Sequence, residues 1–269
     1  PLTGPSRQSL RLQKGAASIG EVVNKYRQPA STSTENVGPL RDIQFKDITI
    51  VFEKEELGLE APIMLEGLPG VGNVGKLAAE HLVSEVKAEK FASIFSKYFP
   101  PQVMVEENGI ARLVSNDLFY HKKTGLEKHD LIVLVGDYQG LTPEGQFLLS
   151  GAMIELARCY NVSKVITLGG FGVGHMVEEP RVLGAASDLK TVEELREIGV
   201  TFTRGEPGSG IVGASGLLVA FAQLTGIPAA CLMGETSGYF VDPASARAKL
   251  RELEQVEEKA TNEDLRYIG

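Results

Sequence analysis

The chain has 269 residues, of which 43% are hydrophobic, enough for one large core or a core with appendages. Its net charge of -8 provides no dominant basic footprint, which argues against a nucleic-acid partner. Two cysteines make no disulfide framework, and the apolar runs are far too short to span a membrane, so we expect a cytoplasmic protein that does not bind membranes.

Residues 1–42 differ from the rest and predict a flexible basic extension. They carry six basic and three acidic residues, which leaves the remaining body at -11. Ser18 and Glu21 form a capping-box pattern inside this extension. Apolar residues recur around that pattern at helical spacing: Ile19, Val22, Val23 and Tyr26. Two interpretations stay open, a transient helix in a disordered arm or a helix that docks on a surface.

The body begins near residue 43, where strands start to alternate with helices. Strands are predicted over 48–52 and 62–66, followed by a glycine turn and a helix over 77–87. Two or three short strands are expected within 91–120. The continuous apolar run at 131–135 is typical of a strand that is covered on both faces.

The second half of the body continues this alternation. Thr142-Pro143 predicts the start of a helix, with threonine as its cap and proline at its first position. A strand over 165–168 follows. Thr191 is then predicted to cap a helix that ends at Gly199, and a strand is expected over 200–203.

The last predicted elements complete one α/β domain over 43–260. They are a buried helix over 217–224, a strand over 229–233 and an acidic helix opened by Asp242-Pro243. Residues 261–269 form a C-terminal tail. Strands that alternate with crossover helices imply a largely parallel or mixed sheet with helices on both sides, an α/β fold.

A glycine-rich turn is the most suggestive local motif. Gly70, Gly72 and Gly75 fit G-x-G-x-x-G, after a strand and before a helix, which is the context of a dinucleotide-binding turn. Lys76 also brings the turn close to a phosphate-binding loop, but Leu77 stands where a hydroxyl would hold Mg²⁺. The turn therefore either binds a phosphate or serves only close helix–sheet packing.

Two further glycine clusters, at 169–174 and 208–213, also follow strands or open helices. Three such turns are expected to line one rim of the sheet, as a ligand pocket or as a flat interface for another subunit. Gly72 and Gly210 are expected to tolerate no side chain. The candidate ligand-binding residues are Gly70, Gly72, Gly75, Lys76 and Asp137. No catalytic residue, metal site or cofactor is predicted, because no catalytic or metal-binding spacing occurs.

Four ordered segments resemble the archaeal branch of the proteasome assembly chaperone family. They are 67–77, 131–144, 169–181 and 208–216, and the similarity spans about 45–240. The resemblance implies a three-layer α/β/α sandwich like that of nucleoside phosphorylases, self-association into a homo-oligomer, and binding to the α-subunits of the 20S proteasome. Some members have also been related to ATP-dependent carboxylate–amine ligases.

The C-terminus bears on how such a protein would bind its partner. Some family members use a tail with a hydrophobic residue, a penultimate tyrosine and a free last residue, whereas here the tyrosine is third from last. The candidate partner-binding residues are Leu265, Tyr267, Ile268 and Gly269. We expect a non-enzymatic proteasome assembly chaperone or adaptor. The alternative is a nucleotide- or nucleoside-binding enzyme, ligase-like, that uses the turn at 67–76.

Overall fold

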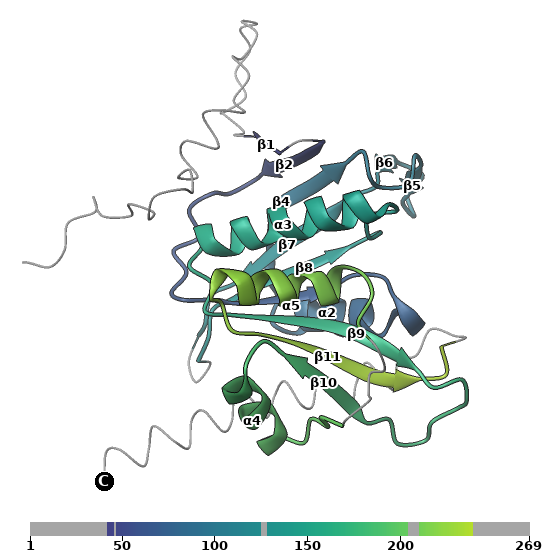
Figure 1. The fold of residues 1–269 in the computed structure, drawn as a ribbon. Coiled ribbons are helices and arrows are strands. Elements are labelled where there is room, and N and C mark those ends of the chain that lie inside the picture. Colours follow the sequence, from purple (N-terminus) through teal and green to yellow (C-terminus); the bar gives the residue numbers. More distant parts are fainter. Residues whose placement is uncertain (1–41, 46, 125–127, 204–209, 239–269) are drawn as a thin grey trace, which may run out of the picture.

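A computed structural model describes residues 42–45, 47–124, 128–203 and 210–238. Within these residues, nine strands form one sheet in the order β1-β2-β4-β7-β8-β3-β9-β11-β10, and β5 and β6 form a separate hairpin (Figure 1). The strands are β1 (Asp42–Phe45), β2 (Ile48–Phe52), β3 (Ile63–Gly67), β4 (Glu89–Ser96), β5 (Val103–Val105), β6 (Ala111–Leu113), β7 (Asn116–His121), β8 (Leu131–Gly136), β9 (Lys164–Gly172), β10 (Val182–Ala186) and β11 (Ala229–Thr236).

The centre of the sheet is parallel and its two sides are antiparallel. Strands β8, β3, β9 and β11 run parallel to one another, with Leu65 opposite Val133 on one side and Ile166 on the other. Strands β1, β2, β4 and β7 extend one side as an antiparallel meander, and β10 closes the other side antiparallel to β11. The sheet is therefore mixed, one of the two arrangements that the sequence allowed.

Helices cover both faces of the sheet and give it three layers (Figure 1). The helical elements are η1 (Val71–Asn73), α2 (Val74–Glu85), α3 (Pro143–Cys159), α4 (Leu189–Glu197) and α5 (Ala214–Thr225). Alternate residues of β8 enter two separate cores: Ile132 and Leu134 pack with α3 and α5, whereas Val133 packs with α2 and α4. This confirms the predicted three-layer α/β/α sandwich. None of the described helices has the length and apolar character needed to cross a bilayer.

The ends of the helices follow from local chemistry, with one correction. The Thr142 hydroxyl accepts a hydrogen bond from the Gly145 N–H at 3.0 Å and caps α3, as predicted. For α4 the cap is Asp188, three residues before the predicted Thr191, because its carboxylate accepts the Thr191 N–H at 2.8 Å. Gly226 ends α5 in the left-handed conformation, at φ 79°.

Several predicted elements differ from the structure. Residues 91–120 contribute to four strands, not two or three, and β10 was not predicted. The predicted strand over 200–203 is wrong, since only a single bridge joins Thr201 to Leu183. Gly184 explains this arrangement: a Cβ there would lie 2.5 Å from the Phe202 ring, so the segment packs across the glycine.

Some predictions fall on residues that the structure does not describe. The basic extension lies outside the described residues except for Asp42, which begins β1. The acidic helix from Asp242 and the tail over 261–269 also lie outside them. The extension, the helix and the tail stay predictions.

Candidate functional site

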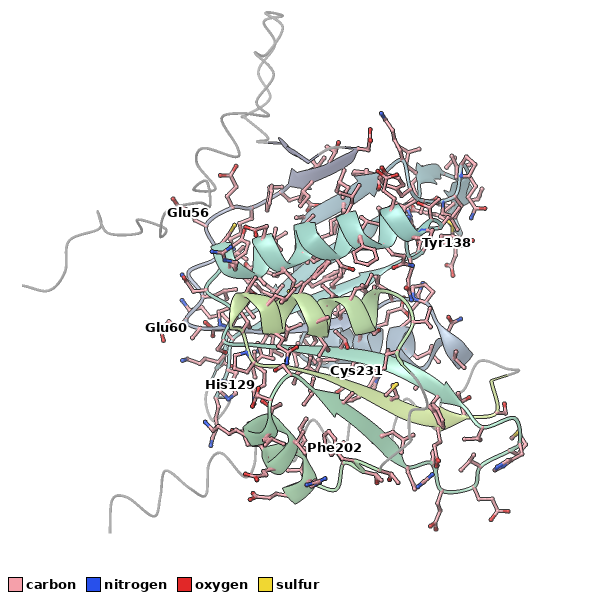
Figure 2. All side chains as sticks on the ribbon, viewed as in Figure 1. Glu56, Glu60, His129, Tyr138, Phe202 and Cys231 are labelled. Atoms are coloured by element: carbon pink, nitrogen blue, oxygen red, sulfur yellow. The ribbon has the colours of Figure 1, made fainter. Side chains whose placement is uncertain are left out.

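The candidate site is the rim where the central parallel strands end. Figure 2 shows Glu60 and His129, which precede β3 and β8, at one end of the sheet, and Tyr138, which follows β8, at the other. Open α/β sheets usually bind ligands at this carboxyl end. We define the glycine rim as residues 68–76, 137–140, 169–174, 210–215 and 236–238.

The first glycine turn joins β3 to α2, and its glycines have different structural roles. Gly72 has φ 62°, and a Cβ there would lie 2.8 Å from the Thr236 hydroxyl. Gly75 lies inside α2, where a Cβ would lie 2.0 Å from the Leu168 carbonyl oxygen of β9. The turn therefore provides a left-handed residue at Gly72 and a close helix–strand contact at Gly75.

The second glycine cluster is part of a strand, which corrects the prediction of a turn. β9 continues through Gly172, paired with β11 to its end at Thr236. A Cβ on Gly170 would lie 2.1 Å from the Val71 carbonyl oxygen, so this glycine lets the η1 backbone rest on the strand. The left-handed residue of this region is Gly174, at φ 75°.

The third cluster leads into α5, and its important glycine is Gly213. It has φ 91°, and a Cβ there would lie 2.5 Å from the Gln139 side-chain oxygen. Among the described residues, no heavy atom lies within 4 Å of a Cβ on Gly210, and the φ of this residue is not left-handed, which counts against the expectation that it tolerates no side chain. Gly208 lies outside the described residues.

Gln139 links the glycine segments and was not singled out from the sequence. Its Nε2 donates to the Pro69 carbonyl oxygen at 2.8 Å, and its Oε1 accepts the Ala214 N–H at 3.0 Å. Gln146 also donates to this Oε1, at 3.2 Å. An N–H at the start of α5, a group that could bind a phosphate in another protein, is thus bonded to a side chain of the protein itself.

A buried carboxylate lies beneath the rim. Glu66, at the end of β3, is fully buried and accepts the Ser215 hydroxyl at 3.0 Å and the Leu68 N–H at 3.1 Å. Thr167 donates to the Ser215 carbonyl oxygen at 3.0 Å. These bonds tie the start of α5 to β3 and β9. The signal in the sequence that could have revealed this cluster is a charged residue, Glu66, inside a predicted buried strand.

The two charged candidates have partners within the protein. Lys76 Nζ lies 3.5 Å from Glu80, one helical turn along α2. Asp137 accepts two hydrogen bonds from Arg112 of β6, including one of 2.9 Å from Nη2, and a third from the Ser115 N–H at 3.0 Å. Burial alone would raise the pKa of Asp137, but these bonds and the nearby charge of Lys76 hold that pKa below its usual range.

The cavity found among the described residues of the rim is small. A cavity of about 20 Å³ lies between Leu68, Gln139, Ala214 and the underlying core, whereas nucleotide-sized pockets are on the order of 300–1,000 Å³. In the described part of the chain, no three His, Cys, Asp or Glu side chains are grouped to hold a metal ion. The rim brings the five ligand-binding candidates into one region. The candidate tail residues lie outside the described chain.

Comparisons with known proteins find relatives in sequence and in structure. An uncharacterised protein of Methanocaldococcus jannaschii, MJ1210, is 43% identical over 199 residues, which cover 74% of this chain and 75% of that protein. The crystal structure of Pyrococcus furiosus PbaB, described as an archaeal proteasome activator, matches with 35% identity and a TM-score of 0.75, covering 83% of this chain and 99% of PbaB. Pyrococcus furiosus PbaA, described as an archaeal homolog of proteasome-assembly chaperone, matches with 27% identity and a TM-score of 0.64, over 78% of this chain and 85% of PbaA.

The family model points the same way as these structures. The model of the PAC2 family matches residues 64–265, which include the whole glycine rim and most of the sheet. The resemblance to proteasome assembly chaperones that the glycine motifs indicated is thereby confirmed. The chain belongs to the PAC2 family.

Proposed function

We propose that this protein is a non-enzymatic proteasome assembly chaperone or activator that works in the cytoplasm as a homo-oligomer and binds the α-subunits of the 20S proteasome. The similarity to PbaB carries this proposal, since 35% identity extends over 99% of that chain. The similarity to PbaA, a homolog of a proteasome-assembly chaperone, supports it.

The chemistry of the glycine rim favours a binding role over nucleotide chemistry. The start of α5 is bonded to Gln139, and Asp137 is engaged by Arg112. Leu77 offers no hydroxyl to a Mg²⁺ ion and packs against the core on the α2 side. We expect calorimetry to detect no Mg²⁺-dependent ATP binding. Micromolar binding that Lys76→Ala abolishes would favour the ligase-like alternative.

The C-terminal tail is the proposed contact with the proteasome. Leu265, Tyr267 and Ile268 are apolar side chains that follow the polar residues 261–264, and Gly269 comes directly after them. A short tail of this kind binds weakly by itself, but an oligomer presents several copies to the ring of α-subunits, which multiplies the affinity.

Surface plasmon resonance with immobilised 20S proteasome tests this contact. Deletion of Tyr267–Gly269 and, separately, Tyr267→Ala should each weaken binding at least tenfold without changing the melting temperature. Thr261→Ala is the matched control and should bind as the wild type does. Unchanged binding of both tail variants, with wild-type binding intact, would show that another surface makes the contact. No binding by the wild type would refute the proteasome role itself.

A further inference from the structure

A groove of about 960 Å³ lies at the side of the sheet away from β10. Its walls come from the start of β2, the end of β4 and the β5–β6 hairpin with the loop before it. The apolar residues that matter here are Phe95, Pro100, Pro101, Val103 and Leu113. Asp47 and Lys97 also line the groove and pair with each other at 2.7 Å, so neither is an unpaired charge within it.

The hairpin beside the groove presents an apolar face to solvent. Val103 lies opposite Leu113 and Val105 opposite Ala111, so these four side chains share one face of the ribbon. Val103, Val105 and Leu113 are 53%, 70% and 63% exposed, and Ile110 at the hairpin turn is 60% exposed. A two-stranded ribbon is marginally stable alone, and a contiguous apolar face of this kind marks an interaction surface.

The hairpin is held in place from its other face. Arg112 bonds to Asp137 at the end of β8, and Met104 packs against the core on the α3 side. Gln102, just before β5, donates to the Tyr138 hydroxyl at 2.7 Å. The apolar face is therefore presented by an anchored element, with Val103 and Leu113 belonging to both the face and the groove.

We propose that residues 18–26 of the same chain occupy this groove and cover the hairpin face. Ile19, Val22, Val23 and Tyr26 recur at helical spacing, which makes one apolar stripe with no core of its own in the sequence around it. Lys25 within this segment and Arg27 just after it suit the acidic Glu107 at the hairpin turn, beside Glu106, which pairs with Arg112 at 3.6 Å. This inference does not depend on the proteasome role.

The position of β1 favours an occupant from the same chain. The described chain begins at Asp42, and Phe45, at the other end of β1, pairs with Ile48, which lines the groove. The length of β1 is about 10 Å at the rise of a strand. Fifteen residues separate Tyr26 from Asp42, and even a random-coil linker of that length spans about 20 Å on average, enough to reach the groove.

Effective concentration favours residues 18–26 of the same chain over the same residues of a second copy. A short linker gives an effective concentration on the order of 1 mM, so a contact with an intrinsic Kd of about 100 µM is closed roughly ten times as often as it is open. A second copy that must bind from solution at micromolar concentration would fill the same groove only to about one per cent. The occupant attached to β1 therefore has the advantage over any copy that binds from solution below millimolar concentration.

Hydrogen exchange measured by mass spectrometry on the full chain tests the proposal. Val22→Asp with Val23→Asp places two charges on the stripe, and we expect amide exchange in residues 103–113 to rise about tenfold. Ser31→Asp with Ser33→Asp adds the same charge outside the stripe and should leave that exchange unchanged. The melting temperature of both variants reports whether the body stays folded.

Two results would overturn the proposal. The first is equal exchange in residues 103–113 for the wild type and for the Val22→Asp/Val23→Asp variant. The second is protection in the wild type that disappears on hundredfold dilution, which would identify a second copy as the occupant. Protection that is independent of concentration and is lost only in the stripe variant supports docking within one chain.

Discussion

The contact between α2 and β9 gives the sharpest test of the packing that shapes the glycine rim. A Cβ placed on Gly75 lies 2.0 Å from the Leu168 carbonyl oxygen and 2.7 Å from its carbon, both backbone atoms of a central strand. Since Cβ atoms essentially never approach within 3.0 Å, Gly75→Ala requires α2 to move about 1 Å away from the sheet. Val74, Ala78 and Ala79, the other buried residues of this helix, would lose contacts in that movement.

The expected cost follows from two opposing effects. Alanine in place of glycine inside a helix gains about 0.5–1 kcal/mol, whereas overpacking against an immobile backbone costs about 1–3 kcal/mol or more, to which the lost contacts of α2 add. We expect a net loss of about 3 kcal/mol, which lowers the melting temperature of a domain of this size by about 6–12 °C. Thermal melts and urea titrations followed by circular dichroism measure both quantities.

Gly151 in α3 provides the matched control. It also lies inside a helix, but no heavy atom of the residues that the structure describes lies within 4 Å of a Cβ at this position. Gly151→Ala should therefore raise the free energy of unfolding by about 0.5–1 kcal/mol. An unchanged or higher melting temperature for Gly75→Ala, with Gly151→Ala behaving as expected, would refute the claim that Gly75 is required by the contact with β9.

Four smaller effects are expected from the same structure. Gly72→Ala should lower the free energy of unfolding by about 1–3 kcal/mol in urea titrations, because φ 62° strains any other residue and its Cβ meets a hydroxyl; a neutral change would contradict this. Gly210→Ala should change it by less than about 0.5 kcal/mol, since the site is open, and a large loss would reveal a contact made by residues beyond the described chain. The pKa of Asp137 is held low in the folded state, so the ionised carboxylate stabilises the fold above the usual carboxyl pKa, and this stabilisation is lost as pH falls through the lowered value. The difference in melting temperature between wild type and Arg112→Leu should therefore shrink between pH 6 and pH 3. A constant difference would show that the Arg112–Asp137 pair is not the source of this pH dependence. Ser150→Ala should leave the melting temperature unchanged or raise it slightly, because in the described part of the chain the buried Ser150 hydroxyl has no hydrogen-bond partner, and a loss above about 1 kcal/mol would show that the hydroxyl is satisfied.

The sequence alone determined the order of the central elements, because each depends on signals from nearby residues. Ile48–Phe52 and the apolar run beginning at Leu131 formed strands at the expected places, and Thr142-Pro143 began α3 as expected. Apolar periodicity, helix caps and glycines that end helices depend on residues only a few positions apart, so the sequence reveals them without knowledge of the fold. The resemblance carried by the glycine motifs likewise pointed to the correct family.

Only the tertiary structure decided which atoms those glycines approach. Whether Gly75 faces a phosphate or a strand depends on residues far away in the chain, and here it faces Leu168. Whether Gly210 is crowded depends in the same way on distant residues, and the described ones leave its surroundings open. The partners of Gln139, at Pro69 and Ala214, lie about 70 residues away in either direction. Such contacts exist only after β8, β3 and β9 align their carboxyl ends, which no local pattern encodes.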